Sequence, residues 1–299
     1  MTEFWSTWVI VLIVVNLGIT VFLFLWGPRV DIPTQPDGTS GHVWAHGVLR
    51  EGVRRLPAWW IALSTVALIS GVAYLALYPG FGAFAGVLGW TSGDQLARSQ
   101  EANRRLEAPL LERVRGKPVE EIAADPDALR VGRVLFIENC AACHGRDARG
   151  NRALGAPDLT DSEWLHGGDG KSILASILDG RQGAMPSFGK AMSDTQIREV
   201  ANYVLSLSGL THDSLRAHFG RERFSACAGC HGADGKGNPK LGAPNLTNNA
   251  WLYSGGVEDI VETIRRGRNG VMPGWRDRLG EENASLVAAW VYAQSRPTR

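Results

Sequence analysis

The chain has 299 residues and is nearly neutral, because 31 Lys and Arg residues balance 30 Asp and Glu residues for a net charge of +1. A nucleic-acid-binding protein is expected to show a marked excess of basic residues, so we expect no nucleic-acid partner. All four cysteines lie in two short motifs, so they do not indicate a fold stabilised by a network of disulfides.

Two uncharged apolar segments lie in the N-terminal third, at residues 4–26 and 59–78. Each is long enough to cross the hydrocarbon core of a bilayer as a helix, which takes about 20 residues. Tryptophans at their ends suit the membrane interface. Asn16 is expected to face another helix, because lipid offers its amide no partner. The segments predict a transmembrane helical hairpin.

A cleaved signal peptide is the alternative for the first segment. Such a peptide has a basic start, a shorter apolar region and a small-residue cleavage site. Here the start, Met1-Thr2-Glu3, is acidic, and no small-residue site follows Trp26. We therefore expect a retained anchor.

The arginines between the two segments predict the orientation of the hairpin. They are Arg29, Arg50, Arg54 and Arg55, whereas the N-terminal tail has no Lys or Arg. Cytoplasmic loops carry an excess of these residues, so the loop is expected to be cytoplasmic. Two crossings return the chain to the side on which it began. The sequence therefore predicts a bacterial inner-membrane protein in which everything after about Tyr78 is periplasmic.

The chain changes character twice more before its C-terminal part. Residues 79–90 are rich in glycine and too short for a third span, so the anchor is assigned to residues 1–90. Residues 91–126 are polar and charged, with Gly116, Pro118 and Pro126 as helix breakers. They predict a periplasmic linker that contains a solvated helix.

The motif Cys-x-x-Cys-His occurs twice, and it is the attachment signal for c-type haem. Each cysteine forms a thioether with a haem vinyl group, and the histidine binds the iron. Half of a zinc site, a redox cysteine pair and a disulfide are the alternatives. The adjoining histidine and the repetition favour two covalently bound haems c, haem 1 and haem 2. The attachment residues are Cys140, Cys143 and His144 for haem 1, and Cys227, Cys230 and His231 for haem 2.

An internal repeat surrounds the two motifs. A displacement of 87 residues aligns Cys140 with Cys227, and between Cys140 and Pro186 it leaves 24 of 47 positions identical. A repeat of this length indicates two copies of one structural unit. We expect two tandem domains, at residues 127–208 and 209–299.

The repeat also selects candidates for the second axial ligand of each iron. Met185 aligns with Met272, and a proline follows each, whereas Met192 aligns with Leu279 and is expected to fill the core. Cytochromes c pair histidine with methionine. We expect His144 and Met185 to bind the iron of haem 1, and His231 and Met272 that of haem 2. Both faces of each iron are then occupied, so no catalytic residue is expected.

Helical patterns dominate both copies. A glycine and a phenylalanine four residues apart precede each motif, Gly132 with Phe136 and Gly220 with Phe224. An apolar stripe follows each methionine, and Ser193 with Gln196 predicts a capping box at the first of these helices. No strand pattern is apparent. The predicted fold is all-α, a two-helix transmembrane hairpin followed by two tandem class I cytochrome c domains.

Two further sets of residues carry weaker expectations. Arg181 and Arg268 repeat near the methionines, and they suit either haem propionates or a structural salt bridge. The remaining histidines have no histidine partner in the repeat, and His166 aligns with Tyr253. They are expected at ordinary surface or loop positions: His42, His46, His166, His212 and His218.

The order of these parts resembles the dihaem subunit, subunit III, of cbb3-type cytochrome c oxidases. The resemblance extends into the membrane third, through these strings: His42-Val43-Trp44, Leu56-Pro57-Ala58-Trp59-Trp60, Tyr78-Pro79-Gly80-Phe81-Gly82 and Gly89-Trp90-Thr91. Ala45-His46 and Arg54-Arg55 depart from the family pattern, which places a difference in the cytoplasmic loop.

The resemblance implies an electron relay that feeds a terminal oxidase reducing oxygen to water and pumping protons. Its implied partners are a catalytic haem-copper subunit, a monohaem cytochrome c subunit and a soluble periplasmic cytochrome c donor. The oxygen site would lie in another polypeptide. Two alternatives stay open, namely a free-standing membrane-anchored dihaem cytochrome and the cytochrome subunit of a periplasmic dehydrogenase. The second apolar segment favours packing in a larger complex, since one span suffices for anchoring.

Overall fold

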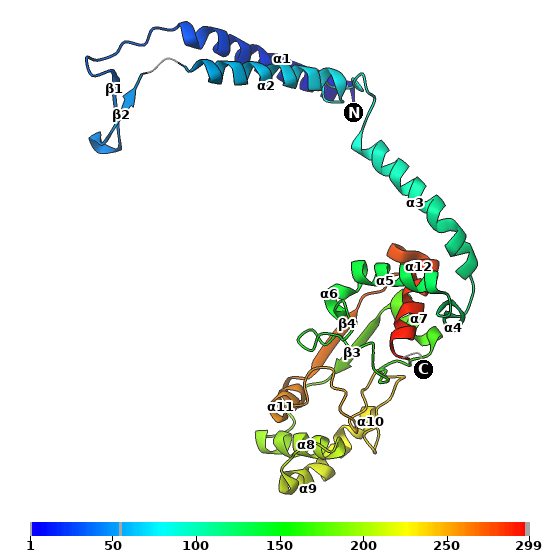
Figure 1. Ribbon diagram of the computed structural model, residues 1–299. Helices are drawn as coiled ribbons and strands as arrows, with labels where there is room; N and C mark the ends of the chain where they lie inside the picture. The colour runs from blue at the N-terminus through cyan, green and yellow to red at the C-terminus, as the bar shows by residue number, and fades with distance from the viewer. Residues whose placement is uncertain (1, 54–55, 297–299) are drawn as a thin grey trace. The chain divides into compact units, whose positions relative to one another are not determined.

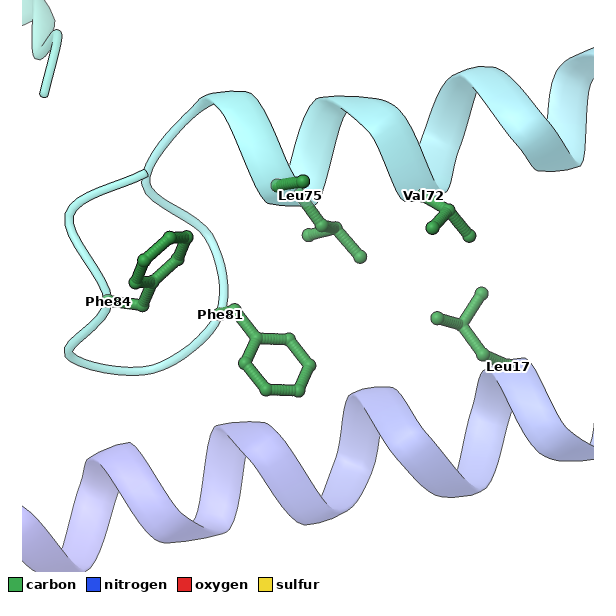
Figure 2. A pocket seen from close by; sticks show the side chains of 6 residues that line it. Leu17, Val72, Leu75, Phe81 and Phe84 are labelled. Carbon is green, nitrogen blue, oxygen red and sulfur yellow. The ribbon is translucent and has the colours of Figure 1, made fainter. Parts of the chain in front are cut away.

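The computed structural model describes residues 2–53 and 56–296 (Figure 1). These form two compact units, Met1–Arg105 and Leu106–Arg299, and each is described by itself. Arg54 and Arg55, which contribute to the predicted orientation, lie outside the described residues.

The first unit contains two apolar helices, α1 (Glu3–Trp26) and α2 (Ala58–Leu77). Both are long and apolar enough to cross a membrane, with mean hydropathy of 2.8 and 1.9 in their most apolar windows. They run antiparallel: Ala83 N, just past α2, donates to Ser6 Oγ at 2.8 Å, and the rings of Phe24 and Trp60 lie 6.5 Å apart at the other end. Asn16 is exposed in this unit, and its amide donates to Leu12 O within α1.

The chain between α1 and α2 contains a short hairpin that the sequence did not predict. A 3-10 turn, η1 (Gly27–Arg29), is followed by β1 (Thr39–Trp44), the turn η2 (Ala45–Gly47) and β2 (Leu49–Gly52), and the two strands pair antiparallel. Ala45 and His46 adopt positive φ at the turn. The strands are short and exposed, so no alternation of apolar and polar residues marked them.

Helix α3 (Ser92–Val114) follows, and only its C-terminal end belongs to the second unit. Val114 is buried there, together with Val119 and Ile122 of α4 (Val119–Ile122). The segment predicted to be a linker therefore contributes apolar side chains to a core at its C-terminal end.

Two separate hydrophobic cores organise the second unit, and Figure 1 shows the two groups of helices that form them. The first core combines α4, α5 (Pro126–Asn139), α6 (Ala141–His144), α7 (Gly170–Asp179) and α12 (Arg276–Gln294). The second combines α8 (Asp194–Leu207), α9 (Ser214–Arg223), the turn η3 (Phe224–Ala226), α10 (Ala228–His231) and α11 (Val257–Arg266). Helix α12 comes from the second repeat and α8 from the first, so the repeats exchange their C-terminal helices.

Close helix crossings demonstrate the exchange. A Cβ atom on Gly132 of α5 would collide with the carbonyl of Leu286 in α12, and one on Gly220 of α9 would collide with the carbonyl of Glu199 in α8. Aromatic rings pair across the same crossings. The rings of Phe136 and Trp290 lie 4.5 Å apart, and those of Phe224 and Tyr203 lie 5.2 Å apart. The two copies are consecutive in sequence, but each core contains parts of both.

A two-stranded ribbon joins the cores where the exchanged segments cross. β3 (Arg181–Met185) pairs antiparallel with β4 (Arg268–Met272), so that Arg181 lies opposite Met272 and Met185 opposite Arg268. The central pair is Gly183 with Gly270. With the β1–β2 hairpin, this ribbon means that the predicted all-α fold is correct only for the bulk of the chain.

The sequence predicted the local features of the helices correctly. Ser193 and Gln196 form the capping box at the start of α8. Asp125, Asp169 and Asp213 accept backbone hydrogen bonds as N-caps of α5, α7 and α9, which satisfies amides that lack a partner in the first turn. Both predicted apolar stripes, on α8 and α12, are buried.

Candidate haem sites

Each Cys-x-x-Cys-His motif forms a single helical turn directly after the helix or turn that precedes it. In the first copy, the amide of His144 donates to Cys140 O at 3.0 Å, and in the second that of His231 donates to Cys227 O at 3.0 Å. Side chains three apart on a helical turn share a face, so both thiols of a motif can reach one planar ligand. All four thiols are free, and Cys143 and Cys230 are exposed.

Burial sets the ionisation of the half-buried thiols. It raises the pKa of Cys140 to about 11 and also raises that of Cys227, with a smaller contribution from the second cysteine of each motif. A catalytic or metal-binding thiol needs its thiolate form. Without a bound ligand, Cys140 and Cys227 are therefore held in the neutral thiol form.

The two histidines are oriented in the same way. Nδ1 of His144 lies 3.2 Å from Pro157 O, and Nδ1 of His231 lies 3.1 Å from Pro244 O. A carbonyl only accepts, so Nδ1 carries the proton and donates, which leaves the Nε2 lone pair of each ring for a metal. Burial lowers the pKa of His144, which further favours the neutral form that binds metal.

The exchange of C-terminal segments decides which methionine lies with which core. Met272 packs against the first core, whose partly buried neighbours include Cys140. Met185 packs against the second core, whose neighbours include Cys227. The prediction from sequence pairs each methionine with the motif of its own copy, whereas the cores group Met272 with Cys140 and Met185 with Cys227. Met192 packs against the second core.

Two buried donors fit an anionic group in the second half. Asn248 Nδ2 and Trp251 Nε1 are buried without a hydrogen-bond partner among the described residues. Both residues line a cavity of about 390 Å³, whose charged lining comprises Arg149 and Arg152 together with Asp158, Asp161 and Glu163. Buried donors are almost always satisfied. A carboxylate such as a haem propionate fits this donor set. The displacement of 87 residues aligns Trp251 with Trp164, and no pattern in the sequence assigned a role to Asn248 or Trp251.

Arg181 and Arg268 occupy equivalent places at the two ends of the ribbon. Arg181 Nε donates to Ser176 Oγ at 2.8 Å, and Arg268 Nε donates to Thr263 Oγ1 at 2.9 Å. The guanidinium of Arg268 also lies 4.2 Å from the ring centroid of Tyr253. Within the described part of the chain neither arginine pairs with a carboxylate, so their charges remain available to an anion.

The aligned residues His166 and Tyr253 each contact the other repeat. A Cβ atom on Gly242 would contact the ring of His166, and one on Gly155 would lie 2.6 Å from the Tyr253 hydroxyl. His166 is therefore a contact between the copies rather than an ordinary loop residue. The alignment of the repeat identified the pair, but only the tertiary structure showed what each residue touches.

Protein-family models match both repeats and part of the N-terminal third of the chain. Residues 127–204 and 214–291 match the family described as cytochrome c oxidase, cbb3-type, subunit III. Residues 36–85 match the N-terminal domain of the cbb3 cytochrome oxidase protein FixP.

Curated relatives match almost the whole chain. The chain is 40% identical to the cbb3-type cytochrome c oxidase subunit CcoP of Rubrivivax gelatinosus, over 97% of this chain and 95% of the relative. It is 36% identical to CcoP of Cereibacter sphaeroides, over 89% and 97%. It is 38% identical to FixP of Azorhizobium caulinodans, over 85% and 92%. The chain belongs to the subunit III family of cbb3-type cytochrome c oxidases, and it is an electron-transfer subunit of such an oxidase.

Proposed function

We propose that the chain carries two covalently bound haems c, through Cys140 and Cys143 and through Cys227 and Cys230. Bound haem supplies a one-electron iron couple. The residues of this chain would hold the iron, exclude other ligands and set its surroundings. The observation that carries the proposal is that each core groups a motif cysteine with a partly buried methionine, Cys140 with Met272 and Cys227 with Met185, while a backbone carbonyl orients the histidine of each motif. The chain itself is non-catalytic, and oxygen is reduced in another subunit.

The packing favours a crossed set of axial ligands. His144 and Met272 would hold the iron of haem 1, and His231 and Met185 that of haem 2. This differs from the pairing expected from sequence because the ribbon carries each methionine into the half that contains the other copy's motif. Methionine ligation raises the potential relative to a second histidine, which suits a relay between cytochromes.

A variant that retains only haem 1 tests the crossed ligands. With Cys227 and Cys230 both replaced by alanine, haem 1 should lose its near-infrared methionine-to-iron absorption on Met272→Ala and keep it on Met185→Ala. Met192→Leu serves as a matched control and should leave the absorption unchanged. The opposite result, in which Met185→Ala removes the absorption, would support ligation within each repeat.

Polar residues around each site hold the haem carboxylates in this proposal. Asn248 and Trp251 donate to a propionate of haem 2 through their unpartnered nitrogens. Arg181 and Arg268 supply positive charge near each methionine, because they lie opposite Met272 and Met185 in the ribbon. A guanidinium matches carboxylate geometry and stays charged at all relevant pH values.

Helices α1 and α2 anchor the chain in the bacterial inner membrane as a transmembrane hairpin. Their length and composition support two crossings, with the β1–β2 hairpin cytoplasmic and both haem regions periplasmic. In this proposal residues 1–90 are the anchor, 91–126 the linker, and 127–208 and 209–299 the two cytochrome repeats.

The proposed path runs from a soluble periplasmic cytochrome c, through the two haems, to the monohaem and haem-copper subunits of a proton-pumping oxidase. Gentle solubilisation followed by native electrophoresis tests the assembly, and the chain should migrate with haem-copper oxidase activity. Migration alone, with undiminished oxygen consumption in cells that lack the chain, would instead support a free-standing cytochrome. Migration with a substrate-oxidising activity would support the dehydrogenase subunit.

A further inference from the structure

The ribbon between the two cores has two different faces. Alternation along the strands places Arg181, Gly183 and Met185 on one face of β3, with Arg268, Gly270 and Met272 in the same pattern on β4. These residues are partly buried and form the inner face. The residues between them are exposed on the outer face: Gln182, Ala184, Asn269 and Val271.

Two glycines face each other in the middle of the inner face. Gly183 pairs directly with Gly270 in a regular antiparallel ladder. Neither adopts a positive φ angle, so the backbone accepts any residue at these positions. Glycine weakens a strand, because it orders a flexible backbone and packs no side chain. The ribbon carries this cost twice at one point.

Steric crowding by the described residues does not require glycine at these two positions. A Cβ atom on Gly183 would meet none of their atoms within 4 Å. One on Gly270 would meet only the Tyr253 hydroxyl, at 4.0 Å, which is an ordinary contact. A glycine within a strand often marks the close approach of a ligand.

The proposed haem ligands flank the glycine pair symmetrically. Met185 and Met272 lie two residues from it on their own strands, about 7 Å along a strand that rises 3.4 Å per residue. Both methionines share the inner face with the glycines. A porphyrin held by either methionine would therefore lie against the inner face of the ribbon, where the two glycines leave the backbone without side chains.

We propose that the Gly183–Gly270 pair is the inter-haem contact of this subunit, where the absence of side chains lets the two porphyrin edges approach across the middle of the ribbon. This inference rests on the proposed function, since it requires a haem in each half. It adds which residues bring the haems together. One electron passes from the ferrous iron of one haem to the ferric iron of the other, and no bond forms or breaks.

Valine substitutions on the two faces of the ribbon test the proposal in the full-length detergent-solubilised protein. Gly183→Val and Gly270→Val add a side chain to the inner face. The matched controls are Ala184→Val and Asn269→Val, each one residue away from a glycine. They change a side chain on the outer face. A flash-excited ruthenium complex injects less than one electron per protein molecule. The fast phase in which electrons redistribute between the two haems is then followed by absorbance, and its rate should not depend on protein concentration. Near-infrared methionine absorption is recorded for each variant.

The inner-face variants should lose the fast redistribution phase while both methionine absorptions persist, and the outer-face variants should retain it. Gly183→Ala and Gly270→Ala should slow the fast redistribution phase less, because the alanine side chain is smaller. If a valine variant fails to fold, the alanine variants test the inter-haem contact instead. Inner-face variants that behave like the outer-face controls, with both methionine absorptions present, would overturn the inter-haem contact and leave the proposed function intact. A parent protein without methionine absorption would instead contradict the proposed ligands.

Discussion

Single residues set how closely the helices of each half can approach. Gly132 and Gly220 lie at equivalent crossings, where a neighbouring helix backbone fills the place of a side chain. The sequence pointed to both glycines through their spacing from Phe136 and Phe224. It did not identify the opposing helix, because a glycine permits another backbone to approach closely but does not specify which segment approaches.

Gly132→Ala should therefore destabilise the protein. Its Cβ atom collides with the carbonyl of Leu286, so α5 and α12 must move apart, and overpacking of this kind costs about 1–3 kcal/mol. Denaturant midpoints of the full-length chain measure the effect. Arg133→Ala changes an exposed neighbour on the same helix and should stay within about 0.5 kcal/mol. Equal midpoints for the two variants would contradict the close crossing.

His166 gives the contact between the repeats a pH dependence. Burial lowers its pKa below the ordinary value of 6.5, the charge of Arg181 lowers it further, and a hydrogen bond involving the Pro239 backbone partly opposes both. Between pH 6.5 and the lower folded pKa, the unfolded state binds more protons than the folded state. Stability is therefore full above pH 6.5 and is lost as the pH falls through this window.

Replacing His166 by the residue found at its aligned position, His166→Tyr, should remove this dependence. The free energy of unfolding of the parent should fall between about pH 7 and about pH 5 more steeply than that of the variant. Chemical unfolding at a series of pH values measures the two slopes. Identical slopes would show that His166 does not titrate at this contact.

At the scale of elements, an ion pair distinguishes the two helix crossings. Arg223 Nε of α9 donates to Glu199 Oε2 of α8 at 2.6 Å, and the side chain of Glu199 is 12% exposed. Counted from the equivalent glycines Gly220 and Gly132, Arg223 corresponds to Leu135, and the displacement of 87 residues aligns Glu199 with Leu286. Leu135 packs against the core that contains Leu286. Pairing within each repeat would place Glu199 against Leu135 and leave a charge against an apolar side chain. The exchanged pairing matches charge with charge and leucine with leucine.

Glu199→Leu should weaken the second half, because it leaves Arg223 without its carboxylate. A buried pair broken in this way costs about 3–5 kcal/mol, and the partial exposure of Arg223 reduces the expected loss to about 1–2 kcal/mol. The double variant Glu199→Leu/Arg223→Leu copies the first half and should recover most of the loss. A double-mutant cycle on denaturant midpoints gives the coupling. Additive effects would show that the two side chains do not interact.

At the scale of the whole molecule, the exchange makes the two repeats depend on each other for their cores. The first core needs α12, which supplies Leu286, Val287 and Trp290 from the far end of the chain. The second needs α8 from the first repeat. Each half therefore lacks a complete core without the other, although each contains a full attachment motif.

A chain that ends at Ser208 should attach haem 1 but not ligate it with methionine. It keeps Cys140, Cys143 and His144 and lacks β4 and α12, so the near-infrared methionine absorption should be absent and proteolysis of α5 rapid. Absorbance and limited proteolysis against the full-length chain measure both effects. A truncated chain with a methionine absorption that disappears on Met185→Ala would show that α8 can replace α12, which would contradict the need for exchange.

The sequence by itself determined the two attachment motifs, the repeat, the apolar helices and the identity of the candidate ligands. These are local properties, because thioether spacing, helical periodicity and capping act within a few residues. Only the tertiary structure decided which methionine shares a core with which attachment cysteine, and it revealed the ribbon between the cores. The repeats are alike in local pattern, so α8 and α12 satisfy the same helical rules in either half. Contacts between distant residues, such as Phe136 with Trp290 and Arg223 with Glu199, select one arrangement, and such contacts leave no periodic signal along the chain.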